Sequence, residues 1–207
     1  MPLDLAVLVD PAHTALVLQE VQNGVVGEAS VLPALAAEAE RVGLVDHCAQ
    51  LARAARAADV PVVHCIAETR PDGRGANRNA RLFHGVRRSP VRLTPGSPAV
   101  SLPHEIGVDE SDLVIPRRHG LGPMAGTGLD PALRNLGVTT IVGVGVSLNI
   151  GMVNFAFDAV NRGYQFVMPR DAVAGVPAEY ADDVVRHTLA LVVTLTTAAE
   201  VIAAWHR

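Results

Sequence analysis

The sequence predicts a three-layer α/β/α protein in which helices cover both faces of a mainly parallel sheet of five or six strands. Short apolar runs alternate along the chain with segments whose apolar residues recur every three or four positions, an alternation typical of βαβ units. The run at residues 139–146 is almost continuously apolar, as expected of a strand covered on both faces. A parallel sheet follows from these two observations.

Five apolar runs predict the strands of this sheet. They span residues 14–19, 61–67, 112–116, 139–146 and 165–169. Residues 192–196 are a candidate for a short sixth strand. Helical patterns lie between most of these runs, at residues 30–58, 130–136, 149–162, 178–192 and 197–206. We expect a break in the first helix near Gly43, an N-cap at Asn149 and a C-cap glycine at Gly163.

Residues 69–110 depart from the alternation, because they form a long Pro-, Gly- and Arg-rich connection without periodicity. Connections this long carry function or are disordered. Between Arg70 and Arg92 the segment holds seven arginines against the single acid Asp72. Two interpretations stay open: a lid or subunit contact that attracts a carboxylate-bearing ligand, or a solvated loop.

Composition predicts a single domain over residues 1–207, since 49% of the residues are hydrophobic and no linker divides the chain. The N-terminal apolar run is short and lacks a preceding basic residue, so we expect neither a signal peptide nor a membrane partner. We expect a cytoplasmic protein, because cysteines are sparse. The net charge of -4 disfavours nucleic acid as the main partner.

Residue content also limits the chemistry. The chain contains no lysine, which excludes Schiff-base chemistry on a lysine amine. The eight histidines form no metal-binding pattern, so we expect no metal and no cofactor. We expect both cysteines in the core. His64 and Cys65 are adjacent in a strand and point to opposite faces, so His64 is badly placed to activate that thiol, and Cys48 lies on an apolar helical stripe.

A predicted strand-to-helix turn is the most informative part of the chain, because it places Gly151 in the first helical turn. A glycine there costs up to about 1 kcal/mol relative to alanine. It leaves backbone N–H groups bare beside the end of a strand, where a small anionic group can bind. The position has no side chain that could act as a nucleophile, and we expect space for water or a ligand.

The turn G-V-S-L-N-I-G-M at residues 145–152 resembles the isochorismatase-like (cysteine hydrolase) superfamily, whose members typically carry a catalytic cysteine in a G-V-x-T-x-x-C-V segment. The resemblance runs from about residue 14 to the C-terminus, and in it Gly151 replaces the cysteine. The chain is thus similar to a divergent member that lacks the catalytic Cys. The resemblance implies a Rossmann-like strand order of 3-2-1-4-5-6, which makes the first and fourth strands neighbours.

The same resemblance assigns the remaining site residues. Glu20 stands where the family has an aspartate before x-Gln-Asn, and Arg118 stands where the family has a lysine, with Arg117 as the alternative if the loop slips. The implied roles are general acid or base for Glu20 and anion anchor, near Glu20, for Arg118. The implied substrate-binding residues are Gly151, Ser147, Val146, Asn149, Gln22, Asn23, Arg117 and His119. Related proteins have a cis peptide at the position of Val146–Ser147, whose N–H groups form an oxyanion hole.

Two functions follow as hypotheses. The first is a small-molecule hydrolase that works without a covalent cysteine intermediate on an anionic substrate, such as an isochorismate-like vinyl ether or a carboxylated amide. The alternative is a non-catalytic ligand-binding or scaffold protein on the same fold. An open pocket that reaches Glu20 would favour the enzyme, and a Glu20–Arg118 pair that fills the site would favour the scaffold. The resemblance also implies a homo-oligomer, a dimer or tetramer.

Overall fold

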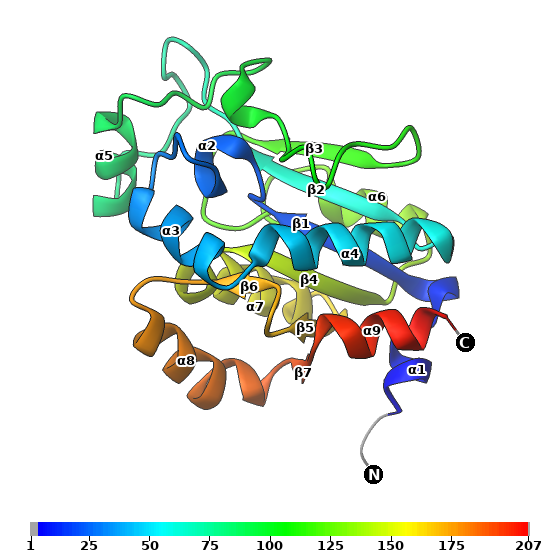
Figure 1. The fold of residues 1–207 in the computed structure, drawn as a ribbon. Helices are drawn as coiled ribbons and strands as arrows, with labels where there is room; N and C mark the ends of the chain where they lie inside the picture. The colour runs from blue at the N-terminus through cyan, green and yellow to red at the C-terminus, as the bar shows by residue number, and fades with distance from the viewer. Residues whose placement is uncertain (1–3, 207) are drawn as a thin grey trace.

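The computed structural model describes residues 4–206, and its centre is one sheet of parallel strands (Figure 1). The strand order is β3-β2-β1-β4-β5-β7, and β6 pairs with β4 outside this path. The strands are β1 (Thr14–Gln19), β2 (Val62–Ala67), β3 (Leu113–Arg117), β4 (Thr140–Val146), β5 (Gln165–Pro169), β6 (Val173–Ala174) and β7 (Thr194–Thr196). The carboxyl ends of β1 and β4 therefore lie side by side, which is where ligands bind in open α/β sheets.

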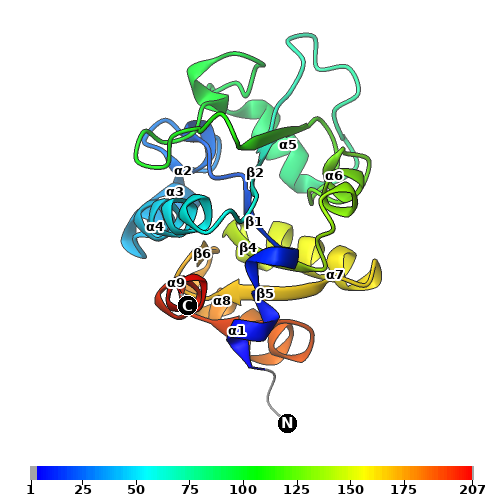
Figure 2. The same cartoon turned by 90° about the vertical axis from the view of Figure 1, so that its right-hand side faces the viewer.

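Helices form a layer on each side of the sheet, as Figure 2 shows edge-on. One layer contains α1 (Leu5–Leu8), α2 (Asn23–Val26), α3 (Pro33–Arg41), α4 (Leu44–Ala57) and α9 (Ala198–Trp205). The other contains α6 (Leu129–Asn135), the π-helical turn η3 (Leu148–Met152), α7 (Val153–Asn161) and α8 (Ala178–His187). No helix in residues 4–206 is long and apolar enough to cross a membrane.

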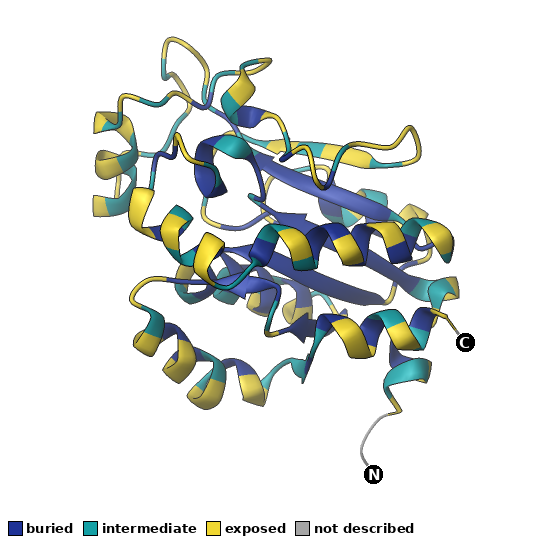
Figure 3. Cartoon of the chain, in the orientation of Figure 1, coloured by how far each residue is buried: buried dark blue, intermediate teal, exposed yellow. Residues whose placement is uncertain are grey.

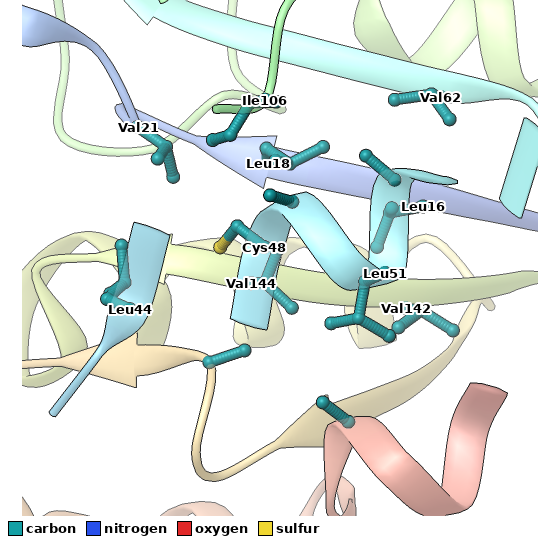
Figure 4. Close-up of a cluster of buried hydrophobic side chains, with 14 of the residues drawn as sticks. Leu16, Leu18, Val21, Leu44, Cys48, Leu51, Val62, Ile106, Val142 and Val144 are labelled. Atoms are coloured by element: carbon teal, nitrogen blue, oxygen red, sulfur yellow. The ribbon is translucent and has the colours of Figure 1, made fainter. Parts of the chain in front are cut away.

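Two apolar cores hold the layers together. On the first side, Leu16 and Leu18 of β1 pack with Leu44, Cys48 and Leu51 of α4 (Figure 4). On the second side, two rings meet edge to face: the Phe155 and Phe166 centroids are 4.9 Å apart at an interplanar angle of 88°. Gly143 makes room for this pair, because a Cβ there would lie 2.2 Å from Phe166 Cζ. Large side chains on both faces of the central strands explain their uninterrupted apolar runs.

The predicted strand positions and order are confirmed to within two residues, and the candidate sixth strand is confirmed as the shorter β7. The helix break is also confirmed, because Gly43 has a φ of 65° between α3 and α4. Gly163 follows α7 with a φ of 87°, as expected of a C-cap glycine. Both cysteines are buried.

Three expectations are wrong in detail. The helix predicted at residues 178–192 ends at His187 and is followed by a separate 3₁₀ turn, η4 (Leu189–Leu191). Asn149 does not cap a helix: its side chain donates a hydrogen bond to Val176 O at 2.9 Å, and Ser147 occupies the N-cap position. The aperiodic connection contains a helix, α5 (Arg81–Arg88), and a 3₁₀ turn, η2 (Pro98–Val100).

A buried charged group fixes the chain between η2 and β3 to the sheet. Asp112 accepts hydrogen bonds from Arg56 Nη2 at 2.6 Å and from Arg56 Nε at 3.1 Å, and its Oδ2 lies 2.9 Å from His64 Nε2. The side chains of His64 and Asp112 are 1% and 0% exposed. Burial lowers the pKa of His64, against the opposing effect of the Asp112 hydrogen bond.

We expect this histidine to make the free energy of unfolding depend on pH. Because the folded-state pKa of His64 lies below its unfolded value of about 6.5, only the unfolded chain takes up the proton as pH falls from about 6.5 toward the folded pKa. Stability should therefore fall in this window by up to about 1.4 kcal/mol per pH unit. Urea unfolding of wild type and His64→Gln between pH 7 and 5 measures the effect, and the variant should show the shallower slope. Equal slopes would contradict the assignment.

Candidate active site

A pocket lies at the carboxyl ends of β1 to β4 and encloses a cavity of about 130 Å³. Glu20 follows β1, Glu68 follows β2, Arg117 and Arg118 lie at the end of β3, and Ser147 with Gly151 comes from the turn after β4. Further lining comes from α2, α3, the connection between these two helices, and α5: Val25, Val31, Leu32, Leu35, Leu82, Phe83, Val86 and Arg87. The pocket is therefore polar at the strand ends and apolar where the helices face it.

Glu20 is held in place by its backbone and by its carboxylate. Its N–H donates to Cys65 O at 2.8 Å, and its φ of 54° lies in the left-handed region that disfavours residues with a Cβ. Its Oε1 accepts a hydrogen bond from Arg117 Nη2, and both side chains are largely buried, with exposures of 16% and 11%. Backbone strain of this kind concentrates at functional sites.

Arg117 is fixed on more than one side. Its Nη2 donates to Glu20, and its Nη1 donates to the backbone carbonyls of His119, at 3.0 Å, and of Gly120. These bonds join the end of β3 to the loop that follows it. The guanidinium is therefore a fixed positive charge beside the Glu20 carboxylate, and the two form a charge-assisted hydrogen bond.

The expectation that Arg118 approaches Glu20 is wrong, and Arg117, the alternative, takes that place. Arg118 pairs with Glu68 instead, through Nε and Nη2, each 2.8 Å from Oε1. Consecutive residues of a strand point to opposite sides, so only one of the two arginines can face Glu20. The register of β3, in which Arg117 pairs with Ala67 of β2, determines that Arg117 is the arginine that faces Glu20.

The place of a side chain at residue 151 is occupied rather than empty, which corrects the expectation of free space there. Gly151 lines the pocket, but a Cβ on it would lie 2.3 Å from Gln19 Nε2 and 3.2 Å from Val146 O. Gln19 is 1% exposed, its Nε2 lies 3.4 Å from Leu121 O, and its Oε1 has no hydrogen-bond partner. The Gln19 amide thus fills the volume where a nucleophilic side chain would stand.

The turn after β4 has the form that the resemblance implies. The Val146–Ser147 peptide is cis. Ser147, Ile150 and Gly151 line the pocket at the start of a helical segment, where backbone N–H groups favour negative charge. Val146 is 0% exposed in the core and does not line the pocket.

The other predicted binding residues divide between the pocket and structural roles. His119 lines the pocket. Gln22 is buried and joins strand ends, since it accepts from Ala67 N at 2.6 Å and donates to Ala67 O at 2.9 Å. Asn23 lies in a different depression and donates to Pro98 O, and Asn149 bonds Val176 O as described above. We find Gln22, Asn23 and Asn149 outside the pocket lining.

Sequence reasoning missed Gln19, Glu68 and the contribution of α5. Gln19 could have been found from the alternation of β1, because it follows Leu18 and must point to the other face of the sheet. Leu82, Phe83 and Val86 show the spacing of a helical face within the arginine-rich segment. Helix α5 spans only about two turns, so this spacing is a weak signal in the sequence.

We expect the packing of Gln19 against Gly151 to be visible in stability. Gly151→Ala in the wild-type background should lower the free energy of unfolding by about 1 to 2 kcal/mol, because overpacking outweighs the better helix propensity of alanine. In a Gln19→Ala background the clash with the amide is absent and the 3.2 Å approach to Val146 O remains, so the same substitution should cost clearly less. Denaturant unfolding of the four proteins in this double-mutant cycle gives the coupling. Effects that add to within about 0.5 kcal/mol would contradict the contact.

Comparison with known proteins shows the family of the chain. A model of the family described as "Isochorismatase domain" matches residues 14–200. YecD of Escherichia coli O157:H7, an uncharacterized isochorismatase family protein, is 31% identical over 100 residues, 48% of this chain and 53% of that protein. The match thus spans about half the length of that relative.

Two longer matches extend the comparison. Ureidoacrylate amidohydrolase RutB of Methylobacterium radiotolerans is 27% identical over 180 residues, 80% of this chain and 69% of that protein. The solved structure of an isochorismatase family protein from Burkholderia thailandensis superposes with a TM-score of 0.77 at 28% identity, over 95% of this chain and 97% of the other. From the family match over residues 14–200, the chain belongs to the isochorismatase family.

Proposed function

We propose that the protein hydrolyses a small anionic molecule without forming a covalent enzyme intermediate, with Glu20 as the general acid and base. The observation that carries this proposal is a pocket that reaches an ordered, paired carboxylate at the family's site. A carboxylated amide is a reasonable substrate class, because the relative RutB is named a ureidoacrylate amidohydrolase. An isochorismate-like vinyl ether is the second class.

The absence of a usable thiol supports direct attack by water. Gly151 has no nucleophilic side chain, and neither Cys48 nor Cys65 lines the pocket. Burial raises the pKa of the Cys65 thiol to about 12, and burial also raises the pKa of Cys48. Both sulfurs therefore stay protonated near neutral pH, and a protonated thiol is a poor nucleophile.

The proposed chemistry moves one proton through Glu20. The carboxylate, hydrogen-bonded to Arg117, accepts a proton from the water whose oxygen attacks the substrate carbon, and it then donates that proton to the leaving group. The backbone at Ser147 to Gly151 lies at a helix start, where it stabilises the negative charge that develops on the substrate oxygen. Arg118, although paired with Glu68, keeps a half-exposed guanidinium at the pocket that can contact a substrate anion.

One observation favours the non-catalytic alternative. The Glu20 carboxylate is already paired with Arg117, and the Gln19 amide fills the space beside Gly151, so the charge at this end of the pocket has a partner within the protein. A binding protein needs no proton transfer, and the same pocket would then only hold the ligand. The two functions differ in whether the protein converts its ligand, with Glu20 transferring the proton, or only binds it.

We expect Glu20→Gln to lower kcat/KM by about 100- to 10,000-fold, the range typical of a lost general acid or base. The measurement is a hydrolysis screen of the purified protein against vinyl ethers and carboxylated amides. Glu105→Gln, a change of the same type at an exposed position outside the pocket, is the matched control and should keep wild-type rates. Equal inactivity of wild type and Glu20→Gln would reject the hydrolase, and ligand-induced shifts in Tm would then test the binding alternative.

A further inference from the structure

The arginine-rich segment is a loop whose two ends, Thr69 and Leu93, are hydrogen-bonded to each other. The Thr69 N–H donates to Leu93 O at 2.6 Å, which brings the first and last residues of the loop together. Leu93 is buried. A second attachment lies within the loop, where Asn77 Oδ1 accepts a hydrogen bond from Gly120 N at 2.7 Å. Gly120 belongs to the stretch that also binds Arg117. The loop is thus tied to the pocket at both points, and α5 lies between Asn77 and Leu93.

Helix α5 covers the pocket, and one of its residues, Val86, also packs against the first apolar core. None of its residues is fully buried, and in Figure 3 it stands at the edge of the molecule in exposed and intermediate colours. Its apolar side chains Leu82, Phe83 and Val86 are partly buried and line the pocket opposite Val31 and Leu35. The apolar wall of the pocket is therefore completed by a helix whose own support is the pocket.

The charges that line the pocket do not cancel. Glu20 is paired with Arg117, and Glu68 is paired with Arg118. The remaining charge is Arg87 of α5, and in the described part of the chain no carboxylate lies within 4.0 Å of its guanidinium. Histidine apart, the lining carries two negative and three positive side chains, so one positive charge is in excess. A pocket with this balance attracts a monoanion.

We propose that α5 determines the specificity of this site: Arg87 binds a carboxylate of the ligand, and Phe83 contacts its apolar body. The inference deepens the proposed function, because it concerns the same pocket. The two arginines of β3, Arg117 and Arg118, already have carboxylate partners. The inference therefore assigns the main contact with the ligand anion to Arg87. Arg87 lies on the same helix as Phe83, which fixes the carboxylate and the apolar body relative to each other.

Benzoate and its neutral isostere benzamide are suitable probes, because they share a ring and differ in charge. An apolar cavity of about 150 Å³ admits benzene, so a cavity of about 130 Å³ that opens to solvent can hold a ring with its substituent at the rim. Equilibrium binding to the full chain is measured by calorimetry. Arg88→Gln is the matched control for Arg87→Gln, because Arg88 is the next residue of α5, is exposed and does not line the pocket.

We expect Arg87→Gln to raise the Kd of benzoate about tenfold, as for the loss of one charge-assisted contact, and to leave the Kd of benzamide unchanged. Arg88→Gln should change neither. Phe83→Ala should weaken both probes by a similar factor, since it removes the apolar contact that they share. Arg87 and Arg88 are both exposed, so their glutamine variants should keep the wild-type Tm.

Three results would overturn the inference: equal affinity of wild type for the two probes, equal effects of Arg87→Gln and Arg88→Gln, or no benzoate binding at millimolar concentration. These results are independent of turnover. Charge-selective binding without any hydrolysis in the substrate screen would support the role of α5 and reject the hydrolase. Hydrolysis that depends on Glu20 but not on Arg87 would support the hydrolase and reject the role of α5.

Discussion

The ion pair between Glu20 and Arg117 is the constraint on which the site depends, because it joins the ends of two strands that are not neighbours. In the sheet, β2 lies between β1 and β3, so the long arginine side chain reaches past the end of β2 to the carboxylate. The same guanidinium holds the loop after β3 through the carbonyls of His119 and Gly120. Removing either charge would leave the other largely buried without a partner, which costs several kcal/mol. The pair therefore stabilises the site whether or not Glu20 also transfers a proton.

The alternation of β1 separates the two polar residues at its end. Gln19 still follows the strand geometry and points toward the turn η3, where its amide lies against Gly151. Glu20 comes directly after the strand and turns, with its positive φ, into the pocket. One strand end thus closes the volume beside Gly151 and supplies the carboxylate. This arrangement explains how a glycine at residue 151 leaves no void in the packing.

The sequence was a good guide where periodicity is strong and a poor one where it is weak. The runs of β1, β4 and β5 are apolar on both faces and predict their strands closely. The choice between Arg117 and Arg118 could not be made in this way. The resemblance places the family's lysine by its spacing from a G-T-x-L-D turn, which is residues 126–130 here. A shift of one residue in the loop between the turn and the arginines reverses the direction of both side chains. Glu68 was overlooked because nothing in its neighbourhood marks it as the partner of Arg118.

Helix α5 is likewise hard to predict from the sequence, because its apolar pattern is short. A helix of eight residues with three apolar positions buries too little surface to be stable alone, so its sequence carries only a weak signal. Its stability has to come from the surface that it covers, which here is the pocket. The strand ends supply fixed, paired charges, whereas the loop supplies an apolar wall and Arg87, a cation without a carboxylate partner among residues 4–206. Because few contacts other than the pocket hold α5, its side chains can change without disturbing the sheet, and ligand preference can diverge while the strand-end geometry is kept.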